Sequence, residues 1–320
     1  MPWMVVLLGM IGGVPERGEA EFRRSAAEPA VPELFRLEAA RFPFELEPRR
    51  DTPRYTVQAL RFPSPIASND PHNDTVHADY FRPKGPGRKP AVVVLHILGA
   101  DFALSRYLAA RLADRGVAAL FVQLPFYGDR RGPDKERRFL SVDIERSMLA
   151  MRQGICDVRR ASAWLAGREE VDPDRLGVAG ISLGGIIASV AAAVDPAIHD
   201  CTPILAGGGL AEILWQMPEG ARYRDLWIAS GKTKADLEKL TNPYDPLTYA
   251  DRLVGKRVFM VAGNVDEVIP PSSARALWER AGQPAIRWYD CGHYSAVGVL
   301  LPALRETVEF FAANPAGGSS

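Results

Sequence analysis

The chain has 320 residues, of which 47% are hydrophobic and 24% charged, a composition typical of a globular protein with a substantial core. Lysine and arginine together number 39, as do aspartate and glutamate, so the formal net charge is zero at pH 7. This balance excludes binding to nucleic acid or to an acidic membrane by overall charge, and we expect no nucleic-acid partner.

The first 20 residues are expected to stand apart from the rest of the chain. Residues 3–14 form an apolar run that is too short to span a bilayer as a helix, so we expect no membrane span. The run fits either the core of a signal peptide, with a weak cleavage site at 18–20, or a disordered start. No lysine or arginine precedes it. We expect export, with the cytoplasm as the alternative, and we expect residues 21–320 to form one domain.

The next part of the chain predicts a surface segment followed by antiparallel strands. Residues 21–53 are rich in Arg, Glu and Pro and are expected to wrap the surface. Apolar and polar residues then alternate over 54–62 and over 75–82, and this period of two predicts two antiparallel edge strands. The segment between them is rich in turn-forming residues.

A regular alternation of strands and helices begins at residue 91. Apolar runs typical of buried strands lie at 91–95, 117–124, 176–179, 203–206 and 257–262, and a last strand is predicted at 285–289. Helical patterns lie at 104–115, 141–167, 186–194, 273–281 and 300–313. The alternation predicts an α/β fold with a mostly parallel central sheet, helices on both faces, and chemistry at the carboxyl ends of the strands.

Residues 209–252 interrupt this alternation. The segment has helical patterns with bulky apolar residues, among them Trp215, Met217 and Trp227. We expect a small helical cap insertion over the strand ends.

The stretch Gly180-Ile181-Ser182-Leu183-Gly184 lies between a predicted strand and a predicted helix. A serine at the apex of such a sharp turn has an exposed hydroxyl, and a Cβ at either glycine would strike the crossing strand or helix. The helix start also favours negative charge developing beside it. The five-residue pattern alone is weak, and an ordinary Gly-rich turn is the alternative, but its context predicts a nucleophile at Ser182.

A nucleophilic serine needs a base, and neutral imidazole suits this role near pH 7. The chain has five histidines: His72, His77, His96, His199 and His293. His72 and His199 fall in turns, and His77 on a predicted edge strand. His293 follows the last predicted strand, where a loop reaches the active end of the sheet, so we predict that His293 is the base.

The imidazole in turn needs a carboxylate that fixes its tautomer. Asp266 lies just after the strand at 257–262, in a turn. Glu267 is the nearest competitor and Asp245 a weaker one. The chain order Ser182, Asp266, His293 favours Asp266.

With these residues the chain resembles the serine esterases of the α/β-hydrolase family, and within it the branch of dienelactone-hydrolase-like and acetyl-esterase-like proteins. The resemblance covers about residues 75–313. It rests on the motif at 180–184, on Asp266 with the following 268–270, and on Gly292-His293.

The resemblance implies the α/β-hydrolase fold, hydrolysis of a small-molecule ester through a Ser-Asp-His triad and an acyl-enzyme, and no metal or organic cofactor. Members named for dienelactone hydrolysis carry cysteine at the elbow, so Ser182 points to ordinary esters. A thioesterase or a peptidase of the same fold, and a non-catalytic ligand-binding protein, are the alternatives.

Many such esterases have His-Gly after the first buried parallel strand, whereas here His96 is followed by Ile97 and Leu98. We expect the oxyanion hole to take one backbone N–H from Leu183 and a second from Ile97 or Leu98. His96 is expected to hold this loop in place rather than to transfer protons.

Three further expectations concern the pocket and the thiols. Phe126 and Tyr127 follow a strand end and are predicted to line the substrate pocket. Trp215 and Met217 in the cap are predicted to cover an acyl group. The three cysteines fit no metal spacing and are expected to be free buried thiols.

Overall fold

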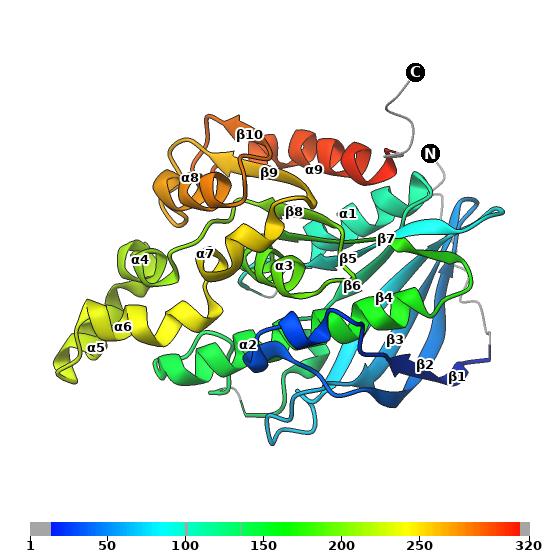
Figure 1. Cartoon of the computed structure of the whole chain (residues 1–320), viewed down its shortest axis with the longest axis horizontal. Helices are drawn as coiled ribbons and strands as arrows, with labels where there is room; N and C mark the ends of the chain where they lie inside the picture. Colours follow the sequence, from blue (N-terminus) through cyan, green and yellow to red (C-terminus); the bar gives the residue numbers. More distant parts are fainter. Residues whose placement is uncertain (1–13, 100–101, 135, 314–320) are drawn as a thin grey trace, which may run out of the picture.

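The computed structural model describes residues 14–99, 102–134 and 136–313. Its centre is a ten-stranded sheet with the strand order β1-β2-β3-β4-β6-β5-β7-β8-β9-β10 (Figure 1). The strands are β1 (Glu16–Phe22), β2 (Ala40–Asp51), β3 (Tyr55–Pro63), β4 (Thr75–Pro83), β5 (Lys89–Leu95), β6 (Ala118–Val122), β7 (Val171–Ile181), β8 (Asp200–Ile204), β9 (Arg257–Gly263) and β10 (Ala285–Tyr289).

The sheet has an antiparallel part and a parallel part. Strands β1 to β4 pair antiparallel with one another, and β4 pairs antiparallel with β6. From β6 through β5, β7, β8 and β9 to β10 every neighbouring pair is parallel. The predicted α/β architecture with a mostly parallel sheet is confirmed, although β8 begins and ends earlier than the 203–206 that we expected.

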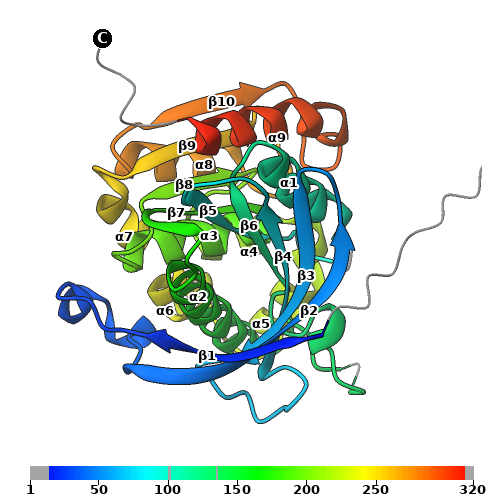
Figure 2. The ribbon, with the colours of Figure 1, turned by 90° about the vertical axis from the view of Figure 1, so that its right-hand side faces the viewer.

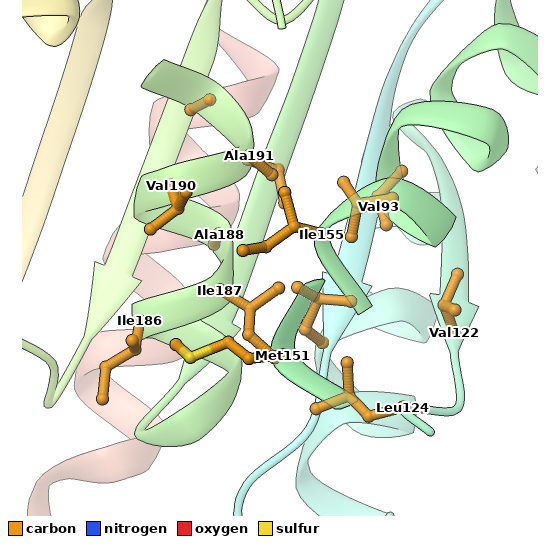
Figure 3. Packing of buried hydrophobic residues seen from close by; sticks show 14 of the residues in the cluster. Val93, Val122, Leu124, Met151, Ile155, Ile186, Ile187, Ala188, Val190 and Ala191 are labelled. Atoms are coloured by element: carbon orange, nitrogen blue, oxygen red, sulfur yellow. The ribbon is translucent and has the colours of Figure 1, made fainter. Parts of the chain in front are cut away.

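Helices cover both faces of the sheet. Helices α1 (Ala103–Asp114) and α9 (Val297–Ala312) pack with one hydrophobic cluster, and α2 (Ile144–Ala166), α3 (Leu183–Val194) and α8 (Pro271–Arg280) with the other (Figure 2). Apolar side chains of α2 and α3, including Ile155 and Ile187, meet over the sheet beside Val93 (Figure 3). The elbow helix α3 is therefore fixed by a packed core on its buried side.

Two expectations for the N-terminal part are wrong. β3 and β4 are antiparallel, but neither is an edge strand, because β2 and β1 extend the sheet beyond them. Residues 40–51, expected to wrap the surface, form β2, in which Phe42 and Leu46 are buried. Pro43 and Pro48 hide the strand pattern of this segment in the sequence. Pro43 faces the outermost strand β1, and Pro48 comes just before a register shift in the pairing with β3. Both are places where a strand tolerates proline.

The boundary that we expected at residue 20 falls inside β1, where Gly18 pairs with Phe44 and Ala20 with Phe42. The apolar run at 3–14 lies outside the described residues except for Val14, and its role in export stays a prediction. Within the described ranges, no helix combines the length and apolar character needed to cross a bilayer.

The segment at 209–252 is helical, with α4 (Leu210–Gln216), α5 (Ala221–Ala229), α6 (Lys234–Thr241) and α7 (Pro246–Tyr249). It connects β8 to its neighbour β9, and Figure 1 shows α4, α5 and α6 projecting from one end of the molecule. The buried carboxylate of Asp245 accepts the backbone N–H groups of Gly209, Leu210 and Leu247 and so ties the beginning of the insertion to its end.

Candidate active site

Ser182 occupies a strained turn between β7 and α3. Its backbone has φ 53° and ψ −116°, and its N–H donates to Ile204 O at 2.8 Å. A Cβ on Gly184 would lie 2.6 Å from His96 O, and one on Gly180 would overlap the backbone of Gly184. Both positions therefore require glycine, and the close approach brings the end of β5 directly against the elbow.

A chain of hydrogen bonds joins three loops at this turn. Ser182 Oγ lies 2.9 Å from His293 Nε2, and His293 Nδ1 lies 2.9 Å from Asp266 Oδ2. Asp266 Oδ1 also accepts the N–H groups of Val268 at 2.9 Å and Ile269 at 2.7 Å. Because a carboxylate faces Nδ1, that nitrogen carries the proton, and Nε2 is left to accept the proton of the serine hydroxyl.

Glu267 contacts the histidine loop without touching the imidazole. Its Oε2 accepts the backbone N–H of His293 at 2.7 Å, and its Oε1 accepts that of Tyr294 at 3.4 Å. The adjacent carboxylates thus have separate partners, Asp266 the ring and Glu267 the main chain. This anchoring contact was missed in the sequence, where the two neighbouring acids at a strand end were the available signal.

His96 holds the loop after β5. Its Nε2 accepts the N–H of Leu124 at 3.0 Å, so Nδ1 carries the proton and donates to Ile97 O at 2.7 Å. Burial lowers the pKa of His96 to about 4, which keeps the ring neutral at pH 7. The ring takes no part in the hydrogen bonds at Ser182. Its two hydrogen bonds join the end of β5 to the segment after β6.

The expected oxyanion donors lie around the same point. Leu183 is the first residue of α3, so its N–H has no partner within the helix. Leu183 and Leu98 line one hollow together with Ser182, whereas Ile97 is absent from its wall. Whether the N–H of Ile97 or that of Leu98 is the second donor stays a prediction.

The hollow beside Ser182 has a volume of about 90 Å³ and an almost wholly apolar wall. Its lining residues come from the loop after β5, the segment before α2, α2 itself, the elbow, the cap and the loop after β9: Leu98, Phe139, Leu140, Ser147, Met148, Met151, Ser182, Leu183, Ile186, Leu210, Ile213, Leu214, Met217, Val268 and Ile269. Met217 lies where we expected it, but most of this wall was not predicted.

Three expected pocket residues do not line this hollow. The ring of Tyr127 packs against His96, with ring centroids 4.9 Å apart, and against Phe139 at 6.2 Å. Phe126 has φ 64° and borders a separate hollow beside α2. Trp215 faces a neighbouring hollow of about 20 Å³ under the cap.

The remaining candidate residues lie apart from Ser182. His72 and His199 are exposed, and His77 lies half-buried on β4. All three cysteines are free and buried, as expected. In the part of the chain that the structure describes, no group of three or more His, Cys, Asp or Glu side chains could hold a metal ion.

Models of two known protein families match parts of this chain. The model of the family described as alpha/beta hydrolase domain containing 18 matches residues 22–209, which include Ser182. The chain belongs to this family. A second model, that of the prolyl oligopeptidase family, matches residues 148–285 of this α/β-hydrolase, a range that includes both Ser182 and Asp266.

Individual curated proteins also match the chain in sequence. An uncharacterized protein of Mycobacterium tuberculosis (strain H37Rv) is 28% identical over 214 residues, which cover 65% of this chain and 50% of that protein. The α/β-hydrolase chain thus spans about half the length of the curated relatives it matches.

Solved structures show the same fold. An acetyl xylan esterase from Paenibacillus sp. R4 has a TM-score of 0.68 at 20% identity, with 83% of this chain and 88% of that chain covered. Acetyl xylan esterase 1 from Thermoanaerobacterium has a TM-score of 0.64 at 21% identity, with 83% and 87% covered. The resemblance to α/β-hydrolase esterases inferred from the sequence is confirmed at the level of family and fold.

Proposed function

We propose that this α/β-hydrolase cleaves carboxylic esters, with Ser182 as nucleophile, His293 as general base and Asp266 as the group that orients the imidazole. The observation that carries the proposal is the hydrogen-bonded chain Ser182 Oγ to His293 Nε2 to Asp266, with both distances at 2.9 Å, on a strained elbow at a helix start. This geometry suits nucleophilic catalysis, because each group is in reach of the proton that it moves.

The proposed reaction has two halves. Ser182 Oγ attacks the ester carbonyl while its proton passes to His293 Nε2, and the backbone N–H of Leu183 with that of Leu98 or Ile97 stabilises the oxyanion. One such donor is typically worth about 100- to 1000-fold in kcat. His293 then protonates the leaving alcohol oxygen, the acyl group remains on Ser182, and a water molecule activated by His293 releases it as the acid. Every proton in this scheme is moved by groups of the chain itself.

The insertion at 209–252 is proposed to be the cap of this site within a single domain at 21–320. Four residues of the apolar wall come from it: Leu210, Ile213, Leu214 and Met217. An apolar wall of this kind accommodates an acyl group rather than a charged or peptide-like one, which would lose its hydrogen bonds to water there.

The match to the prolyl oligopeptidase family model favours a peptidase as second candidate, and a thioesterase would use the same groups. The test is kcat/KM on a p-nitrophenyl ester, a p-nitroanilide and a thioester that share one acyl group, with wild type and Ser182→Ala. Preference for the ester, abolished in Ser182→Ala, supports the proposal. Preference for the anilide would replace it with a peptidase, and full activity in folded Ser182→Ala would refute the nucleophile.

A further inference from the structure

The apolar hollow beside Ser182 shares two lining residues with a smaller hollow under the cap, and these residues bear on the choice of substrate. We propose that the hollow is the acyl subsite, that Leu140 and Leu214 close its far end and limit the length of the hydrocarbon acyl chain, and that the alcohol part of the ester stays on the other side of Ser182, toward His293. The inference rests on the proposed function of Ser182.

The chemistry of the wall defines the class of acyl group. Among the described residues that line the hollow, Ser147 is the only one with a polar side chain apart from Ser182 itself. Met148, Met151 and Met217 account for three of the seven methionines in the chain. Thioether side chains adapt to apolar shapes but offer no strong hydrogen bond. A charged or hydroxylated acyl group would be desolvated there without a partner, so the hollow suits an unsubstituted hydrocarbon chain.

The position of His293 distinguishes the acyl side from the alcohol side. His293 is absent from the wall, whereas Val268 and Ile269, which follow Asp266, belong to it. The base must deliver its proton to the leaving alcohol oxygen, so the alcohol lies on the side of His293 and the acyl group on the other. Tyr294, which follows His293 in the chain, is 57% exposed, so this side of the site borders solvent.

The end wall is formed by two leucines from separate segments. Leu140 lies between β6 and α2, and Leu214 lies on α4 of the cap; both are half-buried. These two residues line the hollow beside Ser182 and also the smaller hollow that contains Trp215, Tyr223 and Trp227. They therefore separate the two spaces, and shortening either side chain should join them.

The volumes set an approximate chain length. A cavity needs about 10–15 Å³ to hold one water-sized group, so the 90 Å³ hollow takes about six to nine such groups and the 20 Å³ hollow about one or two. On this scale an acyl chain of about eight carbons or fewer fits the first hollow, and a dodecanoyl chain exceeds it.

The experiment compares kcat/KM on p-nitrophenyl esters from acetyl to dodecanoyl for wild type, Leu140→Ala, Leu214→Ala and, as matched control, Trp215→Ala. Trp215 lines the smaller hollow and not the one beside Ser182, so its truncation enlarges the smaller space without shortening either leucine. We expect the kcat/KM of wild type to decline by about tenfold or more between the octanoyl and the dodecanoyl ester, since a single methylene in an apolar pocket changes selectivity by about 10- to 200-fold. Both leucine variants should raise the dodecanoyl-to-butanoyl ratio about tenfold, and Trp215→Ala should leave it unchanged.

A second series tests the alcohol side, with acetate esters of alcohols from methyl to naphthylmethyl. Wild type should vary by less than about tenfold in kcat/KM along this series, a smaller effect than a buried apolar contact gives. A thermal melt checks the fold of each variant. Should a leucine variant fail to fold, the rates at which alkyl phosphonates of increasing chain length label Ser182 in wild type give the same profile.

Three results would each overturn the inference while leaving ester hydrolysis by Ser182 intact. They are a wild-type kcat/KM that rises through dodecanoyl, an unchanged dodecanoyl-to-butanoyl ratio in folded leucine variants, and an equal change of this ratio in Trp215→Ala. Absence of ester turnover in wild type, or full turnover in Ser182→Ala, would instead remove the proposed function. The two failures are thereby distinguished.

Discussion

Asp266→Asn is the substitution whose effect the local hydrogen bonds define most closely. Asp266 Oδ1 accepts two backbone N–H groups, from Val268 and Ile269, and Oδ2 faces His293 Nδ1 at 2.9 Å. In the asparagine variant the two backbone donors hold the amide oxygen, so the amide NH₂ turns toward Nδ1. Two N–H groups cannot hydrogen-bond to each other, so Nδ1 becomes the acceptor and the proton moves to Nε2. Ser182 then faces an N–H instead of a base.

The expected loss follows from this change of tautomer. The corresponding Asp-to-Asn change in a Ser-His-Asp triad lowers kcat by about 10⁴-fold, or about 5.4 kcal/mol of transition-state stabilisation. The assay is kcat at saturating butanoyl ester, with a thermal melt to show that the variant is folded. The binding of substrate should change little, because Asp266 does not line the hollow.

Asp290→Asn is the matched control. Asp290 is exposed, lies three residues before His293 and accepts a hydrogen bond from Asn264 at 2.6 Å, so its amide removes the same charge nearby without facing the imidazole. It should stay within about threefold of wild-type kcat, as expected for an exposed charge. A kcat above one tenth of wild type in Asp266→Asn, or an equal loss in Asp290→Asn, would refute the role given to Asp266.

The remaining predictions concern groups that support the site. Glu267→Gln replaces one of the two carboxylate oxygens that accept the backbone N–H groups of His293 and Tyr294. We expect kcat to fall by about tenfold, the equivalent of about 1.4 kcal/mol, as measured by steady-state kinetics. Because burial lowers the pKa of His96 from 6.5 to about 4, the unfolded chain binds the proton first as the pH falls. The free energy of unfolding should therefore drop by about 3 kcal/mol between those two pH values, and His96→Asn should lose that slope in denaturant titrations. Arg130→Met leaves the buried Asp157 carboxylate without its partner at 2.7 Å and should destabilise the fold by about 3–5 kcal/mol, measured by urea unfolding.

Sequence patterns predicted the parallel half of the sheet well and the antiparallel half poorly. Strands such as β5, β6 and β8 are buried on both faces and appear as continuous apolar runs. β1, with the sequence ERGEAEF, has only Ala20 and Phe22 as apolar residues. Its extended conformation depends on pairing with β2, a tertiary effect that local composition does not reveal.

The same contrast applies to the candidate site. Ser182, Asp266 and His293 each follow a strand, so their chain order and the topology were enough to suggest that they meet. The wall beside Ser182 combines α2, the segment before it and the cap, whose relative placement no local pattern gives. Trp215 illustrates the difficulty: its neighbour Leu214 faces the hollow, and one residue along a helix turns a side chain by about 100°.

Covalent labelling is the most direct test of Ser182 as nucleophile. Wild type is treated with a p-nitrophenyl alkyl phosphonate, and the modified peptide is identified by mass spectrometry alongside residual esterase activity. We expect one phosphonyl group per chain, on Ser182, with activity lost in proportion, no labelling in Ser182→Ala, and slow labelling in Asp266→Asn. Labelling of a different serine with loss of activity, or hydrolysis that persists in fully labelled protein, would contradict the assignment.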